Sequence, residues 1–284
     1  MAAIHPYGWG LYKKVVESHM QPGCCGYFDD QGDWQLVGRI NESQDRSGNV
    51  WFTVDCDLQE TTQDSWGPKV SELVKTQTIG GKVGAIIPGT PAEAAVTLVF
   101  ETQADHGCVV VVDNPVALNQ VTINTATKNI PMWIRKNIKM LTSKENYRAQ
   151  AIDHGLWVVT KTYTSRSCAL AMMSGRSSSA EFRLSVNIEG LLVLDPGVAR
   201  RRQISGSSID FHRDDVGGEQ VVVFMSGIYV KRRPFLGGAK TMAKQKGQEP
   251  YVRGEKDNGQ GRIIAVDVGD EKEVWELEKW GEHN

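Results

Sequence analysis

The pattern of hydrophobic and polar positions predicts β-strands along most of the chain. Apolar and polar residues alternate over 78–101, interrupted by the turn signal Pro88-Gly89-Thr90-Pro91. This pattern is typical of a hairpin with two arms of about ten residues and one apolar face. The residues that we place on that face and at its tip are Ile79, Val83, Ile86, Ile87, Val96, Leu98 and Phe100.

A second long hairpin is predicted over 157–194. Its first arm covers 157–173, a Ser- and Gly-rich turn follows, and 180–194 forms the returning arm. Apolar positions in the returning arm alternate strictly with polar ones, and they are Phe182, Leu184, Val186 and Ile188. Shorter strands are predicted at 34–40, 50–58, 109–112, 121–123, 221–224, 228–230 and 262–268.

Helical periodicity appears in three segments. The strongest is 129–150, where Ile134, Ile138 and Leu141 form an apolar stripe and Pro131 fits the first turn. Residues 271–280 predict a short helix near the C-terminus. A short amphipathic helix is also predicted over 8–20, because four apolar residues fall on one side of it, namely Leu11, Val15, Val16 and Met20.

Charge is unevenly distributed, although the whole chain has a net charge of only −2. That balance argues against a dedicated nucleic-acid binder. Residues 128–148 have a local net charge of +5, and residues 267–282 have one of −5. Residues 237–261 carry six glycines and four lysines, which is typical of a flexible linker. We therefore divide the chain into a main domain at 1–235, a linker at 236–261 and an acidic tail at 262–284.

These elements predict an α+β fold: a twisted antiparallel β-sheet with two long amphipathic hairpins and flanking helices. The chain has 284 residues, of which 40% are hydrophobic and 23% charged, so it can bury a large core. The sequence has no secretory signal and no apolar run of transmembrane-helix length. Five cysteines, an odd number, favour reduced thiols. We expect a cytoplasmic protein in its resting state.

Sequence motifs for catalysis or metal binding are missing. There is no C-x-x-C, no histidine pair at metal-ligand spacing and no G-x-S-x-G. We therefore predict no enzyme activity, no cofactor and no metal site. Cys24-Cys25, beside Gly26, is interpreted as two surface thiols in a turn and as a weak candidate for S-acylation.

The long hairpin has properties that suit a membrane. Its arms have the length of a membrane-spanning strand, and small residues are frequent on its apolar face. The basic helices could adsorb to anionic lipid, at about 1 kcal/mol for each Lys or Arg. The lipid-binding residues that we predict are Lys13, Lys14, Arg135, Lys136 and Lys139. The same hairpins would equally serve an ordinary α+β domain as core elements, and alternation alone does not separate the two uses.

The order of these elements resembles the pore-forming domain of gasdermins. A short basic N-terminal helix precedes a Gly-rich hairpin with a Pro-Gly turn, and a basic amphipathic helix is followed directly by 155–163, GLWVVTKTY. In gasdermins a similar V-V-T strand opens the second inserting hairpin. The resemblance covers roughly residues 4–235. It implies a protein that binds acidic phospholipids, oligomerises and opens β-barrel pores that kill the cell.

The chain departs from animal gasdermins because only about fifty residues follow Phe235. It is more similar to the short fungal gasdermin-like proteins of allorecognition. That similarity implies activation either by a protease that removes the tail or by an incompatible partner protein, with action at the plasma membrane or a mitochondrial membrane. We predict that the acidic tail covers the basic surface at rest, with Trp275, Leu277 and Trp280 as its apolar contacts; a merely solvated tail is the alternative.

A soluble module that binds a protein or a phospholipid without perforating a membrane is the alternative function. Its contact patches would be the basic clusters Arg200-Arg201-Arg202 and Lys231-Arg232-Arg233. Release of a dye from vesicles separates the two functions, because a binding module adsorbs without leakage.

Overall fold

The structure is a computed structural model of the chain, and it describes residues 4–5, 7–63, 66–79, 96–143, 147–176, 178–186, 192–194, 200–202, 208–213, 218–232, 262–268 and 271–280. The fold is α+β, with antiparallel sheets and few helices, which confirms the predicted class. The chain divides into two compact units. Unit 1 comprises Met1–Ser18, Glu60–Asn119 and Thr162–Met225, and unit 2 comprises His19–Gln59, Gln120–Lys161 and Ser226–Asn284.

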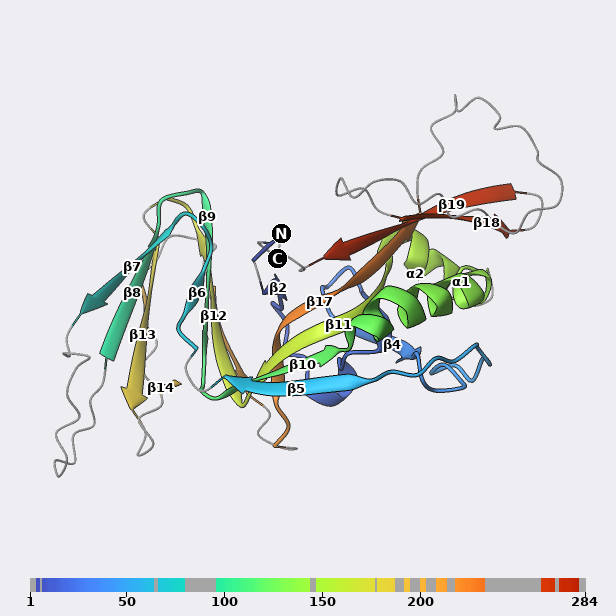
Figure 1. Cartoon of the computed structure of the whole chain (residues 1–284). Helices are drawn as coiled ribbons and strands as arrows, with labels where there is room; N and C mark the ends of the chain where they lie inside the picture. Colours follow the sequence, from blue (N-terminus) through green and yellow to red (C-terminus); the bar gives the residue numbers. More distant parts are fainter. Residues whose placement is uncertain are drawn as a thin grey trace. The chain divides into compact units, whose positions relative to one another are not determined.

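Two antiparallel sheets form much of unit 1 (Figure 1). The inner sheet has the order β16-β12-β9-β6, with bounds Ser208–Arg213, Ser167–Ser174, His106–Val112 and Lys69–Val70. The outer sheet has the order β14-β13-β8-β7, with bounds Leu192–Leu194, Ser179–Val186, Val96–Thr102 and Val74–Ile79; β15 (Arg200–Arg202) also pairs with β13.

The two sheets share a small apolar core. Phe100 and Phe182 of the outer sheet are buried and meet edge to face, with ring centroids 5.8 Å apart. Small side chains of the inner sheet, including Ala169 and Ala171, pack against them. The other face of the inner sheet lines a second core with Trp66, which explains why both faces of β9 and β12 are apolar. The inner sheet is therefore covered on both sides, and the outer sheet on one.

The first predicted hairpin is confirmed where the structure describes it. Strands β7 and β8 pair antiparallel from Val74↔Thr102 to Ile79↔Thr97. Residues 80–95, which include Val83, Ile86 and Ile87, lie outside the described residues.

The second predicted hairpin is wrong in its pairing. The predicted first arm bends at Arg166 into two strands, β11 (Leu156–Ser165) and β12. Strand β12 pairs with β9 and β16, whereas β13 pairs with β8. The chain leaves the inner sheet at Gly175, where φ is +92°, and enters the outer sheet, so 167–174 and 179–186 lie in facing layers.

The predicted helix over 8–20 is also wrong. The structure has strand β2 (Gly8–Gly10) in place of the first turn, and a 3₁₀ turn, η1 (Glu17–His19), near its end. The intervening residues form no helix, bend at 12–13 and are hydrogen-bonded to β17 (Val221–Arg232): the Leu11 amide donates to the Val223 carbonyl at 3.0 Å, and the Val222 amide donates to the Val15 carbonyl at 2.8 Å. A long-range strand partner thus overrides a weak helical pattern. Strand β1 (Ile4–His5) pairs with β2.

Unit 2 combines a hairpin with the helices of the chain. Strands β3 (Cys24–Phe28) and β4 (Trp34–Arg39) form the hairpin, and β3 also pairs with β11. A π-helical stretch, η2 (Thr125–Asn129), leads into α1 (Ile130–Leu141), and α2 is Arg148–Asp153. Strands β5 (Leu58–Gln63), β10 (Val116–Val121), β11 and β17 each have residues in both units.

Helix α1 confirms the predicted apolar stripe. Ile134, Ile138 and Leu141 are buried, and Trp133 meets Trp51 edge to face at 4.9 Å. The predicted helix over 129–150 is divided in two, because α1 ends at Thr142, whose side-chain hydroxyl donates back to the Ile138 carbonyl.

Residues 50–58 do not form the predicted strand, although β4 follows the prediction for 34–40 closely. Residues 51–57 are outside any strand, and Trp51 is buried while Val50 and Phe52 are exposed. The backbone of Phe52 is hydrogen-bonded on both sides by one side chain: its amide donates to Asn137 Oδ1 at 2.7 Å, and its carbonyl accepts from Asn137 Nδ2 at 2.8 Å. The Asn137 side chain of α1 therefore makes the backbone hydrogen bonds that a neighbouring strand would otherwise make.

The tail forms two strands, so the predicted helix over 271–280 is wrong. Strand β18 (Arg262–Val268), which was predicted, pairs with β19 (Glu271–Trp280), and β19 also pairs with β17 (Figure 1). Ten residues are a marginal length for an isolated helix, and the edge of β17 offers partners for every second backbone group.

Candidate functional site

The outer sheet presents one apolar and one polar face. Phe100 and Phe182 are fully buried against the inner sheet, and Leu98 packs half-buried at the margin of the same core. On the other face, Lys75 and Gln77 of β7 are exposed. Side chains alternate between the two faces of a strand, while the backbone hydrogen bonds lie in the plane of the sheet. Another apolar surface could therefore replace the inner sheet on the apolar face without breaking hydrogen bonds within the outer sheet.

The pairing of β7 with β8 shows that one residue predicted on the apolar face has a position on the other face. Thr78 is the partner of Leu98, and Ile79 is the partner of Thr97. Directly paired residues share a face, so Ile79 takes a position on the face opposite to Leu98, one residue out of the predicted phase. Val96 and Leu184 are paired with each other, in phase with Leu98. Val186 ends β13, and Ile188 lies outside the described residues.

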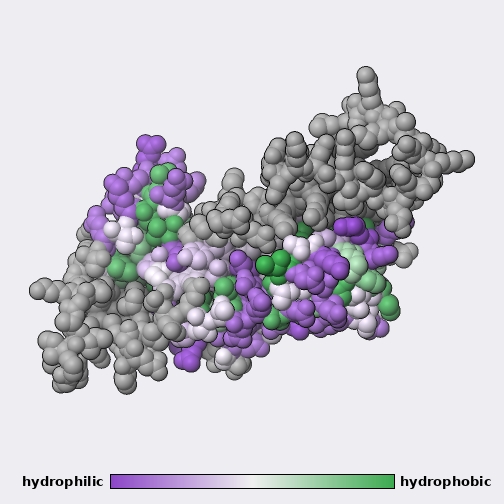
Figure 2. All heavy atoms as spheres, viewed as in Figure 1, coloured by the Kyte–Doolittle hydropathy of each residue, from purple (hydrophilic) through white to green (hydrophobic). Residues whose placement is uncertain are grey.

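Helix α1 carries a basic surface. Arg135, Lys136 and Lys139 are all exposed on the side away from its buried stripe. Within the described part of the chain, none of the three makes an ion pair. Figure 2 shows hydrophilic and hydrophobic side chains next to each other over this part of the molecule. These three exposed cations are candidate contacts for an anionic surface.

Several apolar residues of unit 2 are exposed, and no pattern in the sequence marked them as exposed. Phe52 is 43% exposed, Leu58 53% and Ile123 83%. The Asn137 contacts hold Phe52 beside α1, and Thr122 N donates to the Asp57 carbonyl at 2.9 Å, which brings Ile123 near Leu58. A pattern of apolar positions does not tell an exposed side chain from a core one, so only coordinates could find this set.

Lys13 and Lys14 occupy a different setting from the one predicted. Both are exposed, but they lie on a non-helical segment of unit 1 instead of on a helix. The three cations of α1 share one helix of unit 2, whereas Lys13 and Lys14 belong to unit 1.

Cys24 and Cys25 are buried at the start of β3 and are not surface thiols in a turn. Burial raises the pKa of both thiols, with a smaller opposing effect of the Gln21 backbone and Arg39 on Cys24. A thiol without solvent access and with a raised pKa is a poor nucleophile, so this conformation does not favour S-acylation.

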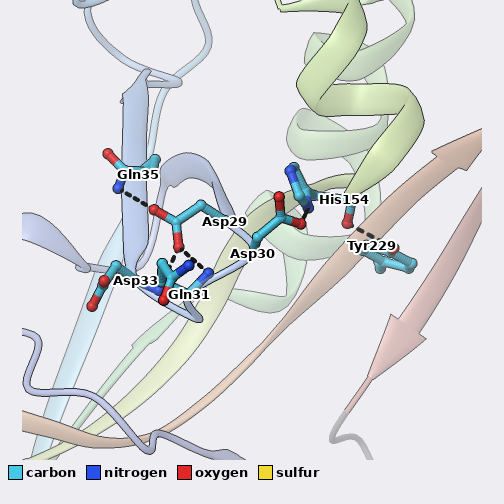
Figure 3. A network of polar contacts seen from close by, with 7 residues as sticks. All are labelled: Asp29, Asp30, Gln31, Asp33, Gln35, His154 and Tyr229. Atoms are coloured by element: carbon cyan, nitrogen blue, oxygen red, sulfur yellow. Dashed lines mark hydrogen bonds and ion pairs between the residues drawn. The ribbon is translucent and has the colours of Figure 1, made fainter.

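A polar network fixes the corner between α2 and β11 (Figure 3). Asp29 accepts hydrogen bonds from the amides of Gln31 and Asp33 and from Gln35 Nε2, which closes the turn of the β3–β4 hairpin. The adjacent Asp30 lies 3.8 Å from His154 Nδ1. These bonds lower the pKa of Asp29, the Asp33 amide contributing most.

The same corner is held from β17. Tyr229 donates its hydroxyl to the His154 carbonyl at 2.9 Å, and its ring lies where a Cβ on Gly155 would stand. Gly155 has φ +70°, so both its conformation and this contact require glycine. We assign the network a structural role at the start of β11.

The predicted tail contacts have defined strand positions. Trp275, Leu277 and Trp280 lie opposite Arg232, Val230 and Gly227 of β17, respectively. Strand β18 lies close to α1.

No helix among the described residues is long and apolar enough to cross a membrane. No three His, Cys, Asp or Glu side chains gather as metal ligands within the same described ranges.

The sequence matches no protein-family profile and no curated protein. Solved structures do match, among them a bacterial gasdermin from Bradyrhizobium tropiciagri. That match has 13% sequence identity and covers 79% of this chain and 82% of the other, with a TM-score of 0.26. A TM-score of this size carries no argument, so the proposal below depends on the residues of this chain.

Proposed function

We propose that this chain is a gasdermin-like pore-forming protein, which binds acidic phospholipids, oligomerises on the membrane and inserts strands of its outer sheet. The observation that carries the proposal is the placement of that sheet. Its apolar face meets a core that includes Phe100 and Phe182, and its other face carries mainly polar residues, among them Lys75 and Gln77. Lipid chains can replace the inner sheet as the cover of the apolar face, and neighbouring subunits then satisfy the strand edges.

Helix α1 supplies the membrane attachment in this proposal. Arg135, Lys136 and Lys139 attract anionic headgroups, while Ile123 and Phe52 enter the interface beside them. Adsorption by this surface concentrates the chains before any strand inserts.

The tail supplies the control. Residues 267–282 carry a net charge of −5, and strand β18 lies close to the basic helix α1. We propose that this hairpin restrains the resting protein, which is cytoplasmic, and that its loss to a protease or to a partner protein permits action at the plasma membrane or a mitochondrial membrane.

Leakage of a dye from phosphatidylserine or cardiolipin vesicles tests the proposal. A chain ending at Gly261 should release more dye than the full chain. In the leaking form, Leu98→Asp should abolish release and leave vesicle binding intact, because a charge on the lipid-facing side of a membrane strand is destabilising. Thr97→Asp, on the neighbouring residue with the opposite face, is the matched control and should retain most of the release.

Two outcomes would contradict the proposal. Equal leakage by Leu98→Asp and the unmodified chain would remove the outer sheet from the membrane. Vesicle binding without leakage by every form would favour a soluble binding module, for which Arg200–Arg202 on the outer sheet provide a basic contact strand. Thermal unfolding of each variant shows whether its fold is intact.

A further inference from the structure

The tail occupies one edge of strand β17 over Gly227–Arg232. Strand β17 has β11 on one side and β19 on the other. An antiparallel edge of six residues exposes a row of N–H and C=O groups when its partner leaves, and such an edge accepts any strand of suitable register. The acceptor edge, as we call residues 227–232, is therefore a strand-binding site that this chain occupies with its own hairpin.

Because strands β18 and β19 pair with each other, the hairpin can bind this edge as one unit. Strands β18 and β19 pair over seven positions, from Arg262↔Leu277 to Val268↔Glu271, so they can leave and bind together. Their match to the edge includes opposite charges, because Lys231 is the partner of Glu276. Glu273 and Glu271 lie beyond the acceptor edge and pair only with β18.

The segment that connects β17 to the β18–β19 hairpin is much longer than the distance between its two ends. Both β17 and β18 are antiparallel to β19, so they run parallel to each other two strand spacings apart, about 10 Å. Val230 and Arg262 share the partner Leu277, so the Cα atoms of Arg232 and Arg262 lie only about 12 Å apart. Residues 233–261 number 29 and can span up to about 100 Å when extended.

We infer that the acceptor edge binds the β18–β19 hairpin of a second copy of this chain, in a reciprocal strand exchange. The exchanged pair reproduces every backbone contact of the closed chain, so the balance depends on concentration alone. A tether of this kind gives an effective concentration on the order of 1 mM, so the closed form dominates in dilute solution and exchange appears where chains are crowded. The inference stands whether or not the chain forms pores.

Cysteine pairs in the full-length chain test the exchange. One chain carries Lys231→Cys and the other Glu276→Cys, and an equimolar mixture is oxidised briefly with diamide at roughly 10 to 500 µM protein. Interchain disulfides should form in about one chain in a hundred at the lowest concentration and in about a third at the highest. The matched control mixes Lys231→Cys with Glu271→Cys, whose position pairs with Val268 and not with β17. The double variant with both cysteines on one chain should close within the chain when dilute.

Each outcome decides the inference. A cross-link that grows with concentration and exceeds the Glu271→Cys control supports exchange. A yield equal to that control, while the double variant closes within its own chain, means that the hairpin never leaves its own sheet and overturns exchange. Failure of the double variant to close removes the acceptor edge itself. None of these readouts involves lipid, so a failure here leaves the proposed function separately testable.

Discussion

The outer sheet of unit 1 and helix α1 of unit 2 are each held by buried apolar side chains, yet they differ in their polar contacts. Helix α1 is fastened by Asn137, which bonds both backbone groups of Phe52 and the Trp133 carbonyl. The outer sheet packs on the inner sheet through an apolar core, in which Phe100, Phe182 and Val74 lie among side chains such as Ala169 and Met173. Apolar contacts are non-directional and can be exchanged for lipid, whereas directed hydrogen bonds fix a position. Helix α1 is therefore fixed by directed hydrogen bonds, whereas the outer sheet is the layer that we propose exchanges its cover.

The largest loss of stability should come from removing one buried aromatic ring from the core of each region. Phe100→Ala and Trp133→Ala should each cost about 3–5 kcal/mol, because each removes a fully buried aromatic ring. Hydrogen exchange should then distinguish them. Phe100→Ala should lose amide protection in β7, β8 and β13 first, and Trp133→Ala should lose it throughout unit 2.

Val99→Ala, on the other face of β8, is the control for the first variant and should change little. If Phe100→Ala loses protection evenly over both sheets of unit 1, the outer sheet is not a separable layer.

The next effect concerns the polar fastening. Asn137→Ala should destabilise unit 2 by about 2–3 kcal/mol, since it leaves the buried-side backbone groups of Phe52 without partners. Asn129→Ala removes one hydrogen bond, to the Asp55 carbonyl, and should cost about 1 kcal/mol. Chemical denaturation measures both. Equal costs would show that Asn137 has no special part in placing α1.

A smaller effect separates the surfaces of the two regions. Each of Arg135→Gln, Lys136→Gln and Lys139→Gln should weaken binding to anionic vesicles about fivefold, corresponding to about 1 kcal/mol per charge. The loss should shrink at high salt. Lys75→Gln, an exposed cation of the outer sheet, is the control in a sedimentation assay. An equal loss for Lys75→Gln would mean that net charge, and not the α1 surface, drives adsorption.

The smallest predicted effect is on pH dependence in unit 1. Burial, followed by the charges of Glu60 and Glu219, raises the pKa of Glu17 above its ordinary 4.5, against the hydrogen bond from Asn119. The folded state therefore gains stability when Glu17 is protonated, a gain that is present below about pH 4.5 and is lost as the pH rises through the raised value.

Glu17→Gln should accordingly be more stable than the unmodified chain at pH 7, by a few tenths of a kcal/mol after solvent screening. The difference should vanish near pH 4 in thermal melts. A variant that is less stable at pH 7 would mean that the bond from Asn119 outweighs the burial of the charge.

Local sequence patterns predicted helix α1, the buried strand β9 and the hairpin whose two strands are adjacent in the sequence. The spacing of Ile134, Ile138 and Leu141 suits one face of a helix and nothing else, and the all-valine run of β9 suits a strand covered on both faces. The hairpin of β7 and β8 follows from alternation on either side of a turn signal, because its partner is adjacent in sequence.

Elements with distant partners could not be predicted in this way. The spacing of Leu11 and Val15 satisfies both a helix and a segment hydrogen-bonded to a strand, and the choice is made by β17, about 200 residues later in the chain. Alternation in 180–186 gives the faces of β13 but does not say that its neighbour is β8. For the candidate site, the sequence found the cations of α1, while Ile123 became visible only through its exposure.

The five cysteines are free, and burial leads the causes that raise the pKa of each thiol, to about 11 for Cys56 and Cys108 and to about 12 for Cys168. Burial and a raised pKa both disfavour the reactive thiolate at neutral pH, so alkylation should be slow until the surrounding structure opens. Cys24, Cys25 and Cys56 belong to unit 2, and Cys108 and Cys168 to unit 1. The five native cysteines can therefore report local opening. The order in which iodoacetamide labels them on a vesicle should show which of the two units opens first.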